Sequence, residues 1–236
     1  MTTQKKPRRT KIVATLGPAT DDPAVLEGLF RAGVNVVRLN FSHGEADDHI
    51  KRANAVKALS KKRSQHVGIL ADLQGPKIRI ARFKNDKVTL QEGADFTIDI
   101  NLDATAGDST QVGCIYKALA DDVAPGNRLL LDDGRIVLEV SSVNGSQIGC
   151  TVIVGGELSN NKGINLQGGG LSAAALTEKD KEDILTAAKI EVDFIAVSFP
   201  RNAEDMHLAR KLVKAAGSHA YLVAKIERAE ALDVLE

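Results

Sequence analysis

The chain has 236 residues, 43% of them hydrophobic and 26% charged, which is enough to bury the core of one large domain or two smaller ones. Its 31 basic and 31 acidic residues balance, so no overall field attracts nucleic acid or a membrane, and any anion site must be local. Aromatic residues make up only 3%, with no tryptophan, which argues against single-stranded nucleic-acid binding and suits an aliphatic core of parallel strands.

Two further features bear on where the protein works. No run approaches the roughly 20 apolar residues of a membrane span, and the stretch after the basic residues 5–9 is too short and too polar for a secretory signal. Cys114 and Cys150 lie in strand-like segments without metal-ligand spacing, so we expect buried thiols in a reducing compartment. The expected location is the cytoplasm.

The first 75 residues alternate between strand and helix patterns. Asp21 or Asp22 can cap the first helix, which has Pro23 in its first turn and Gly33 past its end. Short helices between strands predict a parallel sheet with right-handed crossovers. The expected strands are 10–16, 34–41 and 66–73, and the expected helices are 23–32 and 45–62.

From residue 77 to about 156 the helical period is absent. Short strand-like runs replace it, separated by turn signals such as Asp133-Gly134 and Asn144-Gly145. We expect an inserted all-β domain at 76–171, with an exit linker at 155–170. Its expected strands are 77–83, 87–90, 96–100, 128–131, 136–143 and 148–154.

After Gly170 the α/β pattern resumes. Thr177 and Asp180 form a capping box that opens a helix to about residue 190. The remaining expected elements are strands at 192–199 and 220–227, a helix at 204–216 and the start of a helix at 229–236. Residues 1–75 and 172–236 therefore predict a partial TIM (β/α)8 barrel, with five β units where a closed barrel needs eight.

Polar side chains stand at the carboxyl ends of four predicted strands, where α/β proteins bind their ligands. Arginine and lysine suit phosphate, and the oxygen donors suit hard cations such as Mg²⁺. Together these groups are typical of phosphoryl transfer. The residues are Arg38, Asn40, Ser42, Asp72, Ser198, Lys225 and Glu227.

From Lys11 onward the chain resembles the N-terminal half of the bacterial pyruvate kinases. The phrases that carry the resemblance are TKIVATLGPAT, NVVRLNFSHG, ILADLQGPKIR, LLLDDGRI, LSNNKGIN, LTEKDKEDI, VSFPR and VAKIERAEA. The resemblance implies a barrel A domain with an inserted B domain, and a C-terminal regulatory domain that this chain does not contain. It also implies Mg²⁺-dependent phosphoryl transfer from phosphoenolpyruvate to ADP, giving pyruvate and ATP, in a full-length protein that is a homotetramer.

The same resemblance assigns roles to residues around the substrates. Arg38, Lys225 and Ser198 would bind the substrate, and Lys225 would also stabilise the transferring phosphoryl group and the enolate. Contacts to the nucleotide would come from Asn40, His43, Arg79 and Lys162.

Two cation sites follow from the resemblance as well. Glu227 would be one of two carboxylates that hold Mg²⁺, and the second would lie beyond residue 236, so we expect little or no turnover from this chain alone. A monovalent-cation site would be formed by Asn40, Ser42, Asp72 and Leu73.

Two positions depart from the family pattern. Where many potassium-requiring members have glutamate, this chain has Lys77, whose ammonium could supply the charge that K⁺ provides elsewhere; the alternative is that Lys77 points to solvent. Gln167 stands where the family usually has proline, which would otherwise stiffen the linker.

Two other functions remain open from the sequence. The chain could be a non-catalytic fragment that binds nucleotide, or a Mg²⁺-dependent aldolase or lyase barrel, which also holds an enolate near a strand-end glutamate. The aldolase class does not need an inserted β domain or the nucleotide-facing Arg79 and Lys162.

Overall fold

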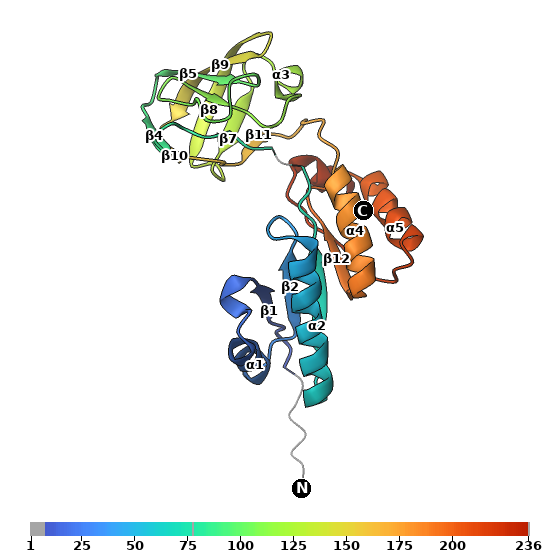
Figure 1. The fold of residues 1–236 in the computed structure, drawn as a ribbon. Coiled ribbons are helices and arrows are strands. Elements are labelled where there is room, and N and C mark those ends of the chain that lie inside the picture. The colour runs from blue at the N-terminus through green and yellow to red at the C-terminus, as the bar shows by residue number, and fades with distance from the viewer. Residues whose placement is uncertain (1–7, 77, 236) are drawn as a thin grey trace. The chain divides into compact units, whose positions relative to one another are not determined.

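The computed structural model describes residues 8–76 and 78–235 (Figure 1). The chain divides into two compact units. The first holds the chain up to Gly75 together with Ala175–Glu227, and the second holds Pro76–Ala174 together with the chain from Arg228 onward. The chain thus passes from one unit to the other at three points.

The first unit is built on a parallel five-stranded sheet of order β1-β2-β3-β12-β13. Strands β3 and β12 are neighbours although the second unit separates them in sequence, and Phe194 pairs with Leu70 between them. The sheet and its helices form a partial (β/α)8 barrel, as expected. The strands are β1 (Val13–Leu16), β2 (Val36–Asn40), β3 (Gly68–Asp72), β12 (Phe194–Val197) and β13 (Tyr221–Ala224).

Helices cover one face of this sheet, and in Figure 1 α2 and α4 lie over that same face. Alternate strand residues such as Leu39, Ile69 and Ile195 point into the core beneath the helices and are almost completely buried. The other alternating set, which includes Arg38 and Asn40, points to the opposite face. The helices are α1 (Pro23–Ala32), α2 (Ala46–Arg63), α4 (Glu178–Ile190) and α5 (Ala203–Ala215), with a 3-10 turn η1 (Pro18–Thr20).

The expected helix signals operate as predicted. Asp22 accepts a hydrogen bond from Ala24 N (2.7 Å) at the start of α1, and Gly33 ends the helix at φ 88°. Thr177 caps α4 in a reciprocal box with Asp180. No helix in the described ranges is long and apolar enough to cross a membrane.

The second unit is an antiparallel β module around its own core. Its six-stranded sheet has the order β11-β7-β8-β9-β5-β6, with β5 and β6 parallel, and β10 pairs with β4. Cys114 and Cys150 are buried, unpaired thiols, as expected. The elements are β4 (Lys87–Leu90), β5 (Asp95–Asp99), β6 (Gln111–Gly113), α3 (Leu119–Asp122), β7 (Arg128–Leu131), β8 (Ile136–Asn144), β9 (Gln147–Val154), β10 (Gly156–Ser159) and β11 (Ile164–Leu166), followed by the late 3-10 segment η2 (Ala229–Val234).

Several expectations about this unit were wrong. The described part of 77–83 is not a strand but a run with isolated bridges at Arg79, Ile80 and Phe83. The stretch expected to be a linker contains β10 and β11, so the linker proper begins near Gln167. The sequence missed β6 and α3, and residues 229–234 form a 3-10 turn in place of an α-helix. Each missed element has at most six residues, too few to show a period.

Candidate active site

Asp72 stands at the centre of the strand-end cluster of the first unit. Its side chain is 4% exposed, and Arg38 Nε donates to its Oδ2 at 2.6 Å. Lys225 Nζ lies 3.2 Å from its Oδ1, close enough for an ion pair. One buried carboxylate is therefore shared by two cations from different strand ends, each of which keeps about 30% of its side chain exposed (31% and 30%).

Lys225 has two further partners. Its ammonium donates to Ser198 Oγ at 2.8 Å and lies 3.3 Å from Glu227 Oε1. Ser198 Oγ in turn donates to Leu73 O at 2.7 Å. The lysine head is thereby held between an acid at the bottom of the cluster and an acid at its rim, where Glu227 is 35% exposed.

The oxygens expected to bind a monovalent cation lie at the ends of β2 and β3. Asn40 pairs with Asp72 across the two strands, and Asn40 Oδ1 accepts from Ser42 N at 3.1 Å. Phe41 N donates to Asp72 O (3.0 Å). The Leu73 carbonyl accepts from Ser198, as described above. These groups share one edge of the sheet, and oxygens of Asn40, Asp72 and Leu73 already accept protein hydrogen bonds.

Close backbone packing holds the ends of β3 and β12 together. Gly75 adopts φ +66°, and a Cβ there would lie 2.9 Å from Ser198 Cβ. Gly75 N donates to Asp180 Oδ1 (3.0 Å), while Asp180 Oδ2 accepts from the backbone and hydroxyl of Thr177 (2.8 and 2.7 Å). Asp180 is completely buried. It therefore ties the strand end that carries Asp72 to the start of α4.

His43 lies beside a cavity of about 350 Å³ in the first unit. The cavity opens at the ends of β1 and β2, and its lining includes Pro18, Asn40 and His43. His49 also lines the cavity, and its ring is stacked on Phe41 with the ring centroids 4.2 Å apart. Burial lowers the pKa of His49.

Arg79 and Lys162 belong to the second unit. Arg79 bridges Gly163, the neighbour of Lys162, so the two cations come from adjoining backbone segments. Lys162 Nζ lies 2.8 Å from Asp132 Oδ1. Asp132 has φ 49° in the β7–β8 turn, and its N donates to Gly163 O (3.2 Å). Lys77 lies outside the described residues, and Gln167 is exposed with its N donating to Arg128 O (2.9 Å).

Sequence reasoning missed two residues of these clusters. Thr15 at the end of β1 accepts from Arg38 Nη1 at 3.0 Å, and Asp132 holds Lys162. Thr15 is the last residue but one of a predicted strand, so the strand-end rule could have included it. The role of Asp132 depends on the pairing of β7 with β11 across 33 residues, since Leu131 lies opposite Ile164. No local signal announces such a pairing.

A divalent cation finds a partial donor set here. The residues that the structure describes contain no group of three His, Cys, Asp or Glu side chains that could hold a metal ion. Glu227 nevertheless presents a partly exposed carboxylate beside Lys225. One or two carboxylates completed by substrate phosphates are what Mg²⁺ commonly uses, so this donor fits a metal that arrives with its substrate.

Comparison with known proteins gives one answer throughout. The family model for the pyruvate kinase barrel domain matches residues 7–236. Pyruvate kinase II of Salmonella typhimurium is 58% identical over 225 residues, and a pyruvate kinase of Haemophilus influenzae is 57% identical over 223; they cover 95% and 94% of this chain.

The structural comparison agrees. A crystal structure of a pyruvate kinase from Cryptosporidium parvum superposes with a TM-score of 0.86 at 30% identity, covering 97% of this chain and 48% of the other. The chain spans about half the length of the curated relatives it matches, 47% in both cases given above. By sequence and by fold, the chain belongs to the pyruvate kinase family.

Proposed function

We propose that the full-length protein transfers a phosphoryl group from phosphoenolpyruvate to ADP, giving pyruvate and ATP. The observation that carries the proposal is the cluster in which Arg38 and Lys225 converge on Asp72 at the carboxyl ends of the sheet strands. Two cations beside a buried acid form a site that accepts a dianionic phosphate while keeping its own charges in place. An aldolase is disfavoured because the family match covers residues 7–236.

The two cations have different chemical tasks. Arg38 uses Nε on Asp72 and Nη1 on Thr15, which fixes the guanidinium plane so that its remaining N–H groups can bind phosphate oxygens. Lys225 is a point charge on a flexible stem, and it neutralises the negative charge that develops on the transferring group and on the enolate oxygen. Ser198 orients the lysine by accepting a hydrogen bond from its ammonium group.

Glu227 is the residue of this chain that would hold Mg²⁺. When bound, the ion would offset the negative charge of the substrate phosphates. Since Glu227 lies beside Lys225, both would act on the same phosphoryl group. We further propose that Asn40, Ser42, Asp72 and Leu73 form the monovalent-cation site, and that the ammonium of Lys77 substitutes for the charge of K⁺.

Nucleotide binding is assigned to two sets of residues, one in each unit. Asn40 and His43 border the cavity described above in the first unit, and Arg79 and Lys162 are neighbours in the second. Lys162 forms an ion pair with Asp132. The phosphates of a bound nucleotide would compete with Asp132 for the Lys162 ammonium. The full-length protein is also proposed to be a cytoplasmic homotetramer that binds neither nucleic acid nor a membrane.

The test is a continuous assay of pyruvate formation by the full-length protein, with phosphoenolpyruvate, ADP and Mg²⁺ present. Lys225→Ala should lower kcat by about 10²-fold or more, the size of effect typical of a lost electrostatic stabiliser. Lys189→Ala, on the exposed end of α4, is the control. Pyruvate release that does not require ADP, or full activity of Lys225→Ala, would contradict the proposal. Assays in potassium-free buffer test Lys77: a strict K⁺ requirement refutes its substitute role.

A further inference from the structure

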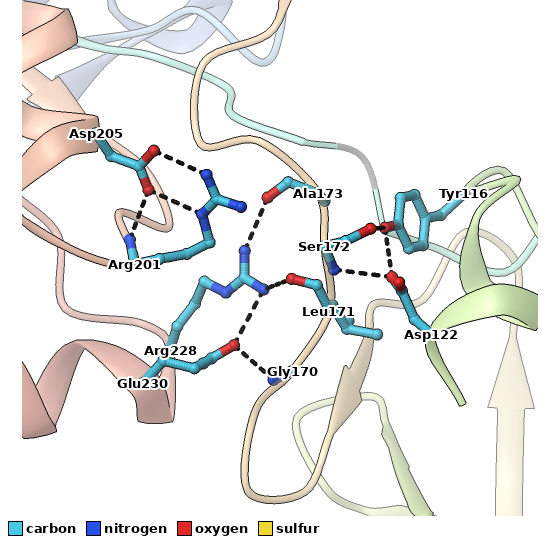
Figure 2. A network of polar contacts seen from close by, with 10 residues as sticks. All are labelled: Tyr116, Asp122, Gly170, Leu171, Ser172, Ala173, Arg201, Asp205, Arg228 and Glu230. Carbon is cyan, nitrogen blue, oxygen red and sulfur yellow. Dashed lines mark hydrogen bonds and ion pairs between the residues drawn. The ribbon is translucent and has the colours of Figure 1, made fainter. Parts of the chain in front are cut away.

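The segment that leads out of the β module is bound by two residues that follow strand β13, Arg228 and Glu230, and we call these contacts the grip. Arg228 Nη1 donates to Ala173 O at 3.0 Å and its Nη2 donates to Leu171 O. Glu230 Oε1 accepts from Gly170 N at 2.6 Å and lies 3.2 Å from Arg228 Nη2. Figure 2 shows these two side chains reaching the same short segment, which we call the linker (residues 170–173).

The linker is also held from the β module itself. Ser172 N donates to Asp122 Oδ2 (2.9 Å), and Tyr116 Oη donates to the same oxygen (2.5 Å). Tyr116 Oη also lies 3.0 Å from Ser172 Oγ. Asp122 ends helix α3, which the sequence did not predict. Four consecutive linker residues therefore make polar contacts, two through carbonyl oxygens and two through backbone N–H groups.

The grip involves two charged side chains that are largely shielded from solvent. The Arg228 side chain is only 7% exposed, so its guanidinium depends on these acceptors. Burial opposes ionisation of Glu230, but hydrogen bonds from backbone N–H groups and the Arg228 charge outweigh it and lower the pKa of Glu230. The pair is therefore charged and charge-assisted at neutral pH.

A glycine makes room for it. Gly168 and Gly169 have the same positive φ of +86°. A Cβ on Gly169 would lie 2.3 Å from Glu230 Cδ, whereas a Cβ on Gly168 would meet nothing within 4 Å. The absence of a side chain at Gly169 is thus required by the contact with Glu230 as well as by the backbone conformation.

Arg228 directly follows Glu227 in the chain, so its contacts with the linker bear on the active site. Lys225 N donates to Val197 O (3.0 Å) and so belongs to the sheet. Only Ile226 and Glu227 lie between that anchor and Arg228. Glu227, the proposed Mg²⁺ carboxylate, therefore lies between a residue that is hydrogen-bonded to the sheet and a residue that is hydrogen-bonded to the linker.

We propose that Arg228 and Glu230 are positioning residues for the phosphoryl-transfer site, which hold Glu227 and Lys225 in place by binding the linker at residues 170–173. The inference rests on the proposed function. The grip joins two of the three points at which the chain passes between the units, at 174/175 and 227/228. We therefore expect a change in the path of the linker to change the position of Glu227.

Hydrogen–deuterium exchange tests the coupling without any need for turnover. In Arg228→Ala and in Gly169→Ala, amide exchange should rise about tenfold or more in the linker and also in residues 225–230. The reason is that the contacts between the linker and Arg228 or Glu230 hold both of these segments. Gly168→Ala is the matched control, since it adds the same methyl group at the same φ without touching Glu230. A rise confined to the linker, or an equal rise in Gly168→Ala, overturns the inference.

Steady-state kinetics of the full-length protein test the consequence. Arg228→Ala should lower kcat by about tenfold while the KM for phosphoenolpyruvate changes little, because a small misplacement of Glu227 and Lys225 acts mainly on the transition state. Arg228→Lys should recover part of the loss, since lysine keeps the positive charge but lacks the planar fork of donors with which arginine reaches both carbonyl oxygens. Unchanged kcat in Arg228→Ala refutes the positioning role.

The two proposals fail in different ways. If the wild-type protein forms no pyruvate from phosphoenolpyruvate and ADP, the proposed function is wrong and with it the role in that reaction. The exchange measurement still decides whether the grip holds residues 225–230. If the wild type is active but the variants show no coupling, only the inference is wrong.

Discussion

Replacing Asp72 with asparagine should destabilise the first unit, because the substitution leaves two cations facing each other around a neutral amide. The lost Arg38 contact is a short, charge-assisted hydrogen bond, for which about 1.5–3 kcal/mol is typical. The Lys225 contact at 3.2 Å is an ion pair with a partly exposed cation and adds about 0.2–1 kcal/mol.

The two contributions cannot simply be summed. Arg38 and Lys225 keep 31% and 30% of their side chains exposed, so water can solvate them once the carboxylate is gone. We therefore expect a loss of about 2–3 kcal/mol, at or just below the lower end of the roughly 3–5 kcal/mol seen when one partner of a fully buried pair is removed. With a urea m-value of about 2 kcal/mol/M, the midpoint should fall by about 1–1.5 M.

Urea unfolding followed by far-ultraviolet circular dichroism is the appropriate assay. The long helices belong to the first unit, whereas α3 of the second has four residues, so the helical signal reports on the first. Glu182→Gln on the exposed side of α4 is the control. Arg38→Met and the double variant complete a cycle, in which a coupling of about 0.5–3 kcal/mol is expected. A loss below 0.5 kcal/mol, or strict additivity, would refute the reasoning.

Three further predictions concern buried groups. Asp180→Ala removes the acceptor of three hydrogen bonds and should cost about 3–5 kcal/mol in urea unfolding; a cost under 1 kcal/mol would contradict its tying role. Burial lowers the pKa of His49 below its usual 6.5, so the folded protein resists protonation of this histidine more than the unfolded chain does. The free energy of unfolding should therefore fall as the pH drops below about 6.5, and it should fall more steeply in the wild type than in His49→Phe. Parallel curves of stability against pH would refute this. Burial raises the pKa of Cys114 to about 11 and of Cys150 to about 12, so a chromogenic disulfide reagent should find both thiols only after unfolding, and rapid reaction of the native chain would be contrary evidence.

Much of the first unit could be predicted from local signals. Asp22, Gly33 and Thr177 mark helix ends through interactions within a few residues, and these operate as expected. The strands of this unit were also found, since apolar β-branched runs between helices leave few alternatives. The predicted strands were one to three residues too long at one or both ends, because the side-chain pattern continues past the last ladder bond.

The second unit was harder for a physical reason. Strand β6 has three residues and β11 has three, and both exist because a distant strand offers hydrogen bonds. Segment 155–170 is rich in glycine and reads as a linker, yet β10 finds β4 across about 66 residues, with Gly156 opposite Leu90. Pairing at such separation depends on the tertiary fold.

The sequence by itself identified the strands and the charged residues near their carboxyl ends, because Arg38, Asp72, Lys225 and Glu227 lie in or just after strands whose pattern is local. Tertiary structure alone decided how those charges are partnered: that one buried carboxylate is shared by two cations, that Asp132 holds Lys162, and that Arg228 reaches back 55 residues to Ala173. Hydrogen bonds and ion pairs depend on distances of a few ångströms between residues far apart in sequence, and only the folded chain sets those distances.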